Sequence, residues 1–149
     1  MNIHIRVGTP DDRAILKKFV NQLVSDLGED FDEKRFDWGI SRRLYDPLQR
    51  HGIFLAENKE TGKAIGMIIA ELRVDPYGLS EGYIKLVFVN SEYRGKGVGE
   101  LLLQEALNHL KKINVQKVKI NLKEEAVNAA KLYEKYKFKK KYEVLELKL

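Results

Sequence analysis

Residues 93–100 read Tyr-Arg-Gly-Lys-Gly-Val-Gly-Glu and contain three glycines within five positions. An apolar run precedes this stretch and a helical pattern follows it, so we predict a glycine-rich turn between a strand and a helix. Such a turn points several backbone N–H groups at one place, and the helix N-terminus adds partial positive charge there. Arg94 and Lys96 add full positive charges. This chemistry suits an anion, most simply a phosphate.

Two common nucleotide-binding loops do not fit the spacing. A Walker loop needs four residues between its first glycine and Gly-Lys-Ser/Thr, and the chain has no such string. A dinucleotide fingerprint that starts at Gly95 would need its third glycine at position 100, which is Glu100. The acidic residue expected about 20 positions further on is also missing, since residues 117–121 read Lys-Val-Lys-Ile-Asn. Both types of nucleotide loop are therefore excluded.

The remaining pattern, Arg94-x-x-Gly97-x-Gly99, resembles the Gln/Arg-x-x-Gly-x-Gly/Ala loop with which the GNAT family of N-acetyltransferases binds the pyrophosphate of acetyl-CoA. A second motif follows in the expected order. Residues 132–138, Leu-Tyr-Glu-Lys-Tyr-Lys-Phe, resemble the family's Leu-Tyr-x-x-x-Gly-Phe at the end of its last helix. Lys137 stands where the family usually has glycine, at a position that favours left-handed φ. Without the resemblance, the loop would be an ordinary turn with basic surface residues.

Composition describes an ordinary globular chain. Its 149 residues predict one domain, 1–149, and 44% apolar with 33% charged residues is typical of globular proteins. The absence of cysteine excludes disulfides, thiolate metal sites and an acyl-cysteine intermediate. A net charge of +5 would suit a polyanionic cosubstrate as well as nucleic acid. No signal peptide and no membrane-length apolar run is present, so we expect a cytoplasmic location.

Hydrophobic periodicity predicts an α/β fold with a mixed, mostly antiparallel sheet and about four flanking helices. Antiparallel strands come first, and β-α-β crossovers follow the glycine-rich turn. This order is similar to that of the GNAT fold along almost the whole chain. The predicted strands are 3–7, 53–56, 64–74, 83–89, 115–122 and 142–149. The predicted helices are 10–27, 32–44, 101–112 with Val98 on its apolar face, and 124–136.

The resemblance implies how acetyl-CoA is bound. The loop amides would hold the pyrophosphate, and the pantetheine arm would pair with the preceding strand as an added strand. An amide there, with Val89 the best candidate, would polarise the thioester carbonyl. Asn128 lies where the family often has an asparagine, and it is either a CoA contact or an exposed helical residue. The implied cofactor-binding residues are Val87, Phe88, Val89, Arg94, Gly95, Lys96, Gly97, Val98, Gly99 and Asn128, with no metal.

The proton-transfer groups are less clearly marked. Tyr133 matches the family's tyrosine acid, which would protonate the leaving thiolate, although a core aromatic would show the same spacing. Many relatives have a carboxylate in the middle of the strand before the loop, where this chain reads Ile-Lys-Leu at 84–86. Glu81 could act as the base through water if the strand alternates without a break. Glu71 is the other candidate, and selection of the neutral amine would need no base.

The acceptor is suggested by a run of carboxylates near the predicted junction of the first two helices, which forms one wall of the acceptor cleft in the family. A cationic amine would suit this run, although it also fits a solvated loop. We therefore expect acetyl transfer to a primary amine of a small cationic molecule. Alternatives are a protein lysine or N-terminal acetyltransferase and a CoA-binding module without catalysis. Nucleic acid and membrane partners are not expected, and a homodimer stays open. The carboxylates are Asp26, Glu29, Asp30, Asp32, Glu33 and Asp37.

Overall fold

A computed structural model describes residues 2–122 and 127–149 of the chain, without the side chains of 127 and 128. In the described part, five strands form one sheet in the order β1-β2-β3-β4-β5. The first four strands are antiparallel to their neighbours, and β5 runs parallel to β4. The strands are β1 (Ile3–Val7), β2 (Ile53–Asn58), β3 (Lys63–Val74), β4 (Ser80–Val89) and β5 (Val118–Ile120).

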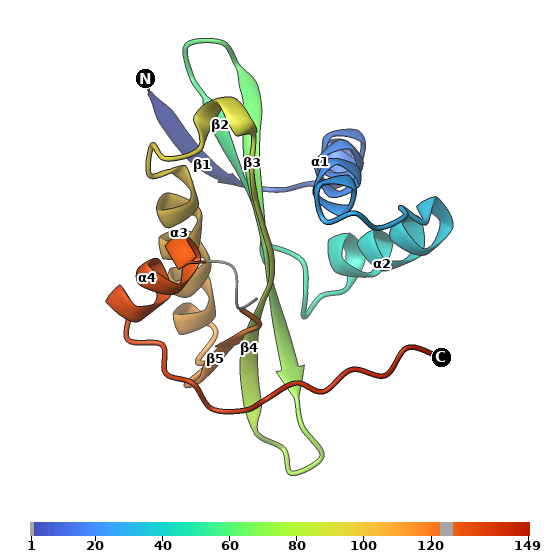
Figure 1. The fold of residues 1–149 in the computed structure, drawn as a ribbon, viewed down its shortest axis with the longest axis vertical. Helices are drawn as coiled ribbons and strands as arrows, with labels where there is room; N and C mark the ends of the chain where they lie inside the picture. The colour runs from blue at the N-terminus through green and yellow to red at the C-terminus, as the bar shows by residue number, and fades with distance from the viewer. Residues whose placement is uncertain (1, 123–126) are drawn as a thin grey trace.

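Helices cover both faces of this sheet. α1 (Arg13–Asp26) and α2 (Glu33–Tyr45) pack on one face, and α3 (Val98–Lys112) and α4 (Val127–Lys135) lie on the other (Figure 1). The short 3-10 turn η1 (Pro10–Asp12) leads into α1, and η2 (Ser91–Tyr93) follows β4. The predicted mixed sheet with helices on both faces is confirmed. None of the described helices is long and apolar enough to cross a lipid bilayer.

β3 lies at the centre of the sheet, and its side chains are buried on both faces. Met67 packs with Leu16 and Phe19 of α1, whereas Ile68 packs with Leu102 of α3 on the opposite face. This two-sided burial explains why the sequence of β3 is a continuous apolar run rather than an alternating one. β3 therefore fixes the position of β4, the strand that leads into the glycine-rich turn.

Several of the predicted elements differ in length, and β2 and β4 are longer than the strands predicted at 53–56 and 83–89. The strand predicted at 115–122 is limited to β5, which spans three residues. Asn114 adopts a left-handed φ of 64° just after α3, so the chain turns there before it reaches the sheet. Residues 124–126 of the helix predicted at 124–136 lie outside the described residues, and α4 accounts for the rest up to Lys135.

The strand predicted at 142–149 is wrong. Residues 139–149 have no regular structure and extend past the β4–β5 end of the sheet (Figure 1). The alternation of apolar residues favours a half-buried strand, but a strand also needs an edge with free N–H and C=O groups of matching length. β5 offers only three residues, and the segment makes no strand pairing in the described chain, although Lys119 of β5 lies over the Tyr142 ring at 4.7 Å. The exposed apolar residues of the segment are Tyr142, Val144, Leu145, Leu147 and Leu149.

An ion cluster ties β1 and β2 to the start of α1. The Arg6 guanidinium donates two hydrogen bonds to the Asp12 carboxylate, of 2.7 and 2.8 Å, and also binds Glu57. Asp12 in turn accepts the Thr9 N–H at 2.8 Å. The hydrogen bonds from Arg6 lower the pKa of Asp12 below its ordinary value of 3.8, although burial opposes this. The cluster therefore stabilises the ionised carboxylate of Asp12 relative to its protonated form.

We expect Asp12→Asn to lower the free energy of unfolding at pH 7 by about 2 kcal/mol, because the charge-assisted bonds to Arg6 are lost. The folded-state pKa of Asp12 is lowered, so its contribution is complete above the ordinary value of 3.8 and is lost as the pH falls through the folded-state pKa. Urea unfolding at pH 7 and pH 3 should show the difference between wild type and variant shrinking in acid. Asp11→Asn, at an exposed neighbour, is the control and should change stability little. A difference that is the same at both pH values would contradict this account.

Candidate active site

The glycine-rich turn uses left-handed backbone at two of its three glycines. Gly95 has φ 77°, and Gly97, with φ 81°, is the N-cap residue of α3. Side-chain-bearing residues adopt this conformation only at a cost, which explains glycine at these two positions. Gly99 lies in the first turn of α3, where a Cβ would lie 3.8 Å from the Val89 side chain. The Val98 side chain is buried in the core and anchors the start of the helix.

The backbone amides of the turn have no acceptor within the described chain. Counting from the turn into α3, the first N–H with a hydrogen-bond acceptor is that of Leu101, which donates to the Gly97 carbonyl at 3.2 Å. None of the N–H groups of residues 95–100 donates to a described backbone or side-chain acceptor. Unsatisfied N–H groups at a helix N-terminus, together with the helix dipole, form an anion-binding arrangement. The turn therefore has the geometry that its sequence predicted.

The two basic side chains of the turn differ in what they contact. Arg94 Nε donates to the Val89 carbonyl at 3.0 Å, and its Nη2 lies 3.4 Å from Asp26 at the end of α1. The guanidinium thus joins the turn to the ends of β4 and α1. Lys96 Nζ lies 5.6 Å from the centre of the Tyr93 ring. Lys96 therefore has the greater freedom to reach an anion at the turn.

The last part of β4 has an open edge. β5 pairs with β4 only from Gly82 to Ile84, so no described strand lies beside residues 86–89 on that side. On the other side, the Asn90 N–H donates to the Ile65 carbonyl of β3 at 2.7 Å. Because successive residues of a strand point their N–H groups to opposite edges, the amides of Val87 and Val89 point to the open side. An extended molecule could pair there as an added strand.

Phe88 has the opposite orientation. Its side chain is buried, with its ring 4.9 Å from that of Phe19. Its carbonyl oxygen faces β3, since a Cβ on Gly66 would lie 2.7 Å from it. Of the three residues predicted to hold the pantetheine arm, Val87 and Val89 therefore offer their amides to the open edge, and Phe88 does not.

A β-bulge breaks the alternation of β4 at Lys85. Ile69 of β3 lies opposite Leu86 and the next residue, Ala70, lies opposite Ile84, which leaves Lys85 without a partner. As a result, Ile84 packs on the α3 face, whereas Lys85 and Leu86 both line the α2 face. The alternation on which the choice of Glu81 depended therefore ends before Val87, whose side chain packs on the α3 face.

Both candidate base carboxylates are in ion pairs. Glu81, near the start of β4, lies 2.9 Å from Lys119 of β5. By strand geometry it is roughly 15 Å along β4 from Leu86. Glu71 of β3 lies 3.4 Å from Arg43 and 3.6 Å from Arg73. The structure does not bring either carboxylate to the open part of the β4 edge.

Tyr133 lies on α4, half-buried against the α3 face of the core. Its ring contacts that of Phe138 edge-on, with 5.6 Å between the centroids. Burial raises the pKa of the Tyr133 phenol above its ordinary value of 10.0, so the hydroxyl stays protonated at neutral pH. The backbone of Asn128 lies within α4, but its side chain is outside the described residues.

The end of α4 is a Schellman motif that fixes Tyr133. Phe138 N–H donates to the Tyr133 carbonyl at 3.0 Å, and Lys137 N–H donates to the Glu134 carbonyl at 2.9 Å. Lys137 has φ 68°, the left-handed position that the sequence placed there. The ring contact between Phe138 and Tyr133 is the apolar contact that usually accompanies this motif. A lysine therefore occupies a position better suited to glycine.

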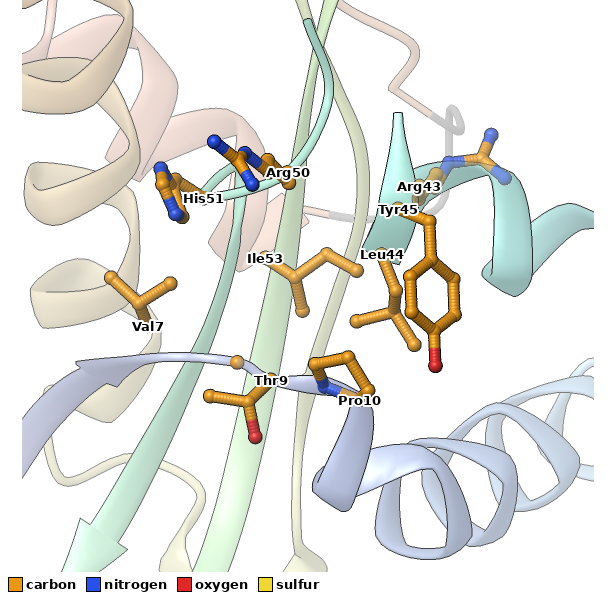
Figure 2. A pocket seen from close by; sticks show the side chains of 10 residues that line it. Val7, Thr9, Pro10, Arg43, Leu44, Tyr45, Arg50, His51 and Ile53 are labelled. Carbon is orange, nitrogen blue, oxygen red and sulfur yellow. The ribbon is translucent and has the colours of Figure 1, made fainter. Parts of the chain in front are cut away.

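Two hollows open on the α1–α2 side of the molecule. The smaller, of about 240 Å³, lies between α1, α2, β3 and β4, with an apolar lining of Val20, Phe36, Ile40, Ile69 and Leu86. Arg35, Arg43 and Lys85 also line it. The larger, of about 650 Å³, lies at the ends of β1 and α2 and the start of β2. Figure 2 shows Arg50 and His51 on one side of Ile53 in this larger hollow, with Leu44 and Tyr45 on the other. Because β3 lies between β2 and β4, only the smaller hollow borders β4.

The three cations of the smaller hollow were not predicted as site residues. Arg35, Gly39 and Arg43 are spaced by four along α2, which places them on one helix face, and this spacing could have indicated that they act together. Strand alternation places Lys85 on the same face as Tyr83, but the sequence does not show that α2 packs on that face.

We expect Lys137→Gly to raise the free energy of unfolding by about 1 kcal/mol, because a non-glycine residue with left-handed φ is strained. For a chain of this size the melting temperature should rise by about 2–4 °C. Asn114→Gly is the matched control, since Asn114 has φ 64° but asparagine tolerates this conformation better than lysine. A larger rise in melting temperature for Asn114→Gly than for Lys137→Gly would contradict the expectation.

Comparison with known proteins places this geometry in a family. The family model for the acetyltransferase (GNAT) family matches residues 17–138. An uncharacterized N-acetyltransferase of Schizosaccharomyces pombe is 28% identical over 137 residues, which cover 89% of this chain and 80% of that protein.

Solved structures show the same fold. A possible acetyltransferase from Clostridium difficile 630 superposes with a TM-score of 0.80 at 22% identity, covering 100% of this chain and 99% of that one. A chain of the NatC complex, solved bound to Gag peptide and CoA, gives a TM-score of 0.75 at 20% identity over 91% of this chain and 84% of that one. The chain therefore belongs to the GNAT family and is an acetyl-CoA-dependent N-acetyltransferase.

Proposed function

We propose that the protein transfers the acetyl group of acetyl-CoA directly to a primary amine of a small molecule, with both substrates bound at once. The observation that carries this proposal is the continuity of two features along the chain. The open edge of β4 at residues 86–89 leads directly into the unsatisfied amides of residues 95–100 at the start of α3. The amides at the start of α3 suit a diphosphate, and the neighbouring edge of β4 suits an extended arm attached to it.

The chain offers a group for each part of the cosubstrate. The amides of Gly95 to Glu100, with Lys96 beside them, would hold the pyrophosphate. Val87 and Val89 would pair with the pantetheine arm, and the Val89 N–H would polarise the thioester carbonyl. Asn128 would add a contact from α4. Because these groups are mostly backbone amides fixed by β4 and α3, they need little reorganisation when the substrate binds.

In the transfer, the amine nitrogen attacks the thioester carbon, the new C–N bond forms and the C–S bond breaks. The thiol of the departing CoA has a pKa of about 8.5, so its thiolate needs a proton donor when it leaves. Tyr133 fills this role in our proposal. Its raised pKa keeps the phenol protonated throughout the neutral range, so a proton is available for the leaving thiolate.

The attacking amine must lose its proton before or during the attack. Glu81 as the base, acting through water, stays a prediction, and its ion pair with Lys119 at 2.9 Å would have to loosen for that role. Glu71 is held in the same way by Arg43 at 3.4 Å. The route without a base, in which the enzyme binds the neutral fraction of the amine, requires no change in either ion pair.

A small acceptor is supported by the size of the hollow beside β4, about 240 Å³. The alternative acceptors are a lysine side chain or the N-terminus of a protein. The predicted positive charge of the acceptor finds no support at this hollow. Four of the six carboxylates between α1 and α2 are in ion pairs, and none of the six lines the hollow.

Gly97→Ala tests the cosubstrate site. A Cβ at Gly97 meets nothing within 4 Å, so the change strains the left-handed backbone without a clash and disturbs the amides of the turn. We expect CoA to bind about tenfold more weakly, a loss of about 1.4 kcal/mol, in isothermal titration calorimetry. Gly62→Ala carries the same strain, with φ 71° and open space, in the β2–β3 turn. It should destabilise the fold similarly and leave CoA affinity unchanged, and equal affinities in the two variants would refute the site.

Tyr133→Phe tests the transfer itself. Wild-type protein with acetyl-CoA and a panel of small amines, lysine peptides and N-terminal peptides should release free thiol with at least one small amine, followed with a thiol-reactive dye. Loss of the phenol should lower kcat about 100-fold with little change in CoA affinity, because general acid catalysis is typically of this size. Tyr136→Phe is the control, since the Tyr136 hydroxyl accepts a bond from Gln104 at 2.7 Å instead. An unchanged kcat in Tyr133→Phe would remove Tyr133 from the mechanism, and silence with every amine would overturn the proposed function.

A further inference from the structure

The hollow between α2 and the β4 bulge has a strongly positive lining. Arg35, Arg43 and Lys85 contribute to its wall, and none of the described carboxylates does. Arg43 and Arg73 share Glu71, at 3.4 and 3.6 Å, and Arg35 at the rim lies 3.6 Å from Asp32. These two carboxylates do not balance Arg35, Arg43, Arg73 and Lys85, so the hollow is a place where a bound anion would be stabilised.

Arg43 has hydrogen-bonding capacity left over. Its Nη1 donates to the Gly39 carbonyl at 3.3 Å, and its Nη2 makes the long contact to Glu71. Its Nε is buried and has no acceptor among the described residues. A guanidinium normally satisfies its donors when it is buried, and its fork-like geometry matches the oxygens of a carboxylate or phosphate. Arg43 is thus held in place by two contacts and has a donor left for a ligand.

Lys85 has no carboxylate within ion-pair distance among the described residues. Burial lowers the pKa of its ammonium group, and the nearby Arg73 and Arg43 lower it further, whereas Glu71 acts in the opposite direction. This repulsion is what an anion in the hollow would relieve. Lys85 shares its face of β4 with Tyr83, and its Nζ lies 5.6 Å from the centre of that ring. The β-bulge adds Leu86 to the same face, because without it the alternation of β4 would place Leu86 on the α3 face.

The hollow also adjoins the predicted reaction centre. Lys85 and Leu86 line it, and Val87, whose amide faces the open edge, is the next residue along β4. Strand spacing puts Val87 roughly 7 Å from Lys85 along the chain. A molecule with an anionic group at Lys85 and Arg43 could therefore present an amine, a few bonds away, to the thioester beside Val87 and Val89.

We propose that the acceptor amine carries a carboxylate or phosphate group, which binds in the hollow between α2 and the β4 bulge against Arg43 and Lys85, with Arg35 at the rim. This inference rests on the proposed acetyl transfer, since it names the substrate class of that same site. It replaces the positive acceptor expected from the sequence with one that has a negative group. The amine and the anionic group lie on one small molecule, in keeping with the volume of about 240 Å³.

Matched amines test the inference in the acetyl-transfer assay. The carboxylate arm compares 4-aminobutyrate with butylamine, which lacks the carboxylate, and with putrescine, which has a cation in its place. The phosphate arm compares O-phosphoethanolamine with ethanolamine. We expect kcat/KM to be at least tenfold higher for the anionic member of at least one arm, mostly through a lower KM, and the arm that shows this identifies the anion. Equal values within both arms, or the highest value for putrescine, would overturn the inference and leave acetyl transfer intact.

Lys85→Met keeps the length of the side chain and removes its charge. It should abolish most of the preference for the anionic amine, measured as the ratio of kcat/KM between the two members of the arm. Lys85→Arg should retain part of the preference. Lys59→Met, at an exposed position after β2, is the control for loss of one surface lysine and should behave as wild type. A preference that survives in Lys85→Met would remove Lys85 from the anion site.

A binding measurement decides the matter if none of these amines is acetylated. Reductive ¹³C-methylation labels the lysines, and Lys85→Arg identifies the signal of Lys85 by its disappearance. Saturating 4-aminobutyrate or O-phosphoethanolamine should raise the pKa of that signal by at least half a unit, whereas butylamine and ethanolamine should not. An unchanged Lys85 signal would overturn the anion site. A shift at Lys85 without any thiol release or CoA binding would instead support the anion site and count against acetyl transfer.

Discussion

The left-handed backbone at Gly95 and Gly97 is the constraint on which the site depends. It lets β4 turn directly into α3, so the unsatisfied amides at the start of the helix lie next to the last residues of the strand. The buried Val98 side chain and the bond from Arg94 Nε to the Val89 carbonyl hold this junction rigid. Burial of apolar side chains on both faces of β3 fixes β4 in turn. Packing of the core thus fixes the position of the junction, and the glycines adopt the left-handed φ that residues with a side chain reach only at a cost.

The bulge at Lys85 divides β4 into two parts with different roles. Before it, β4 pairs with strands on both sides, and its polar side chains make ion pairs such as that of Glu81 with Lys119. After it, β4 pairs only with β3 within the described chain, and Val87 and Val89 point their amides to the open edge. The same bulge places Leu86 on the α2 face beside Lys85. One irregular residue therefore separates the paired part of β4 from the part with an open edge.

Most of the fold could be predicted because local patterns and burial agree. Strands β1 to β4 and helices α1 to α3 follow from apolar periodicity together with glycine and proline at their ends. The left-handed residue at Lys137 followed from the position of a glycine in the family motif. The C-terminal strand failed because alternation states which face of a strand is apolar but not which edge it pairs with. Glu81 as the base stays a prediction, but the alternation behind that choice breaks at the bulge, since strand alternation predicts a face only while the register is unbroken.

Local sequence was enough to place the glycine-rich turn at the start of α3, since glycine spacing and the strand-to-helix change act over a few neighbouring residues. It also determined the class of fold, because each element carries its own periodicity. The tertiary structure alone decided which groups meet from different elements: Arg43 of α2 with Lys85 of β4, Glu71 with two arginines, and Arg94 with the end of α1. The physical reason is that charge interactions depend on distance in space, whereas residues 43 and 85 come together only through the packing of α2 on a bulged strand.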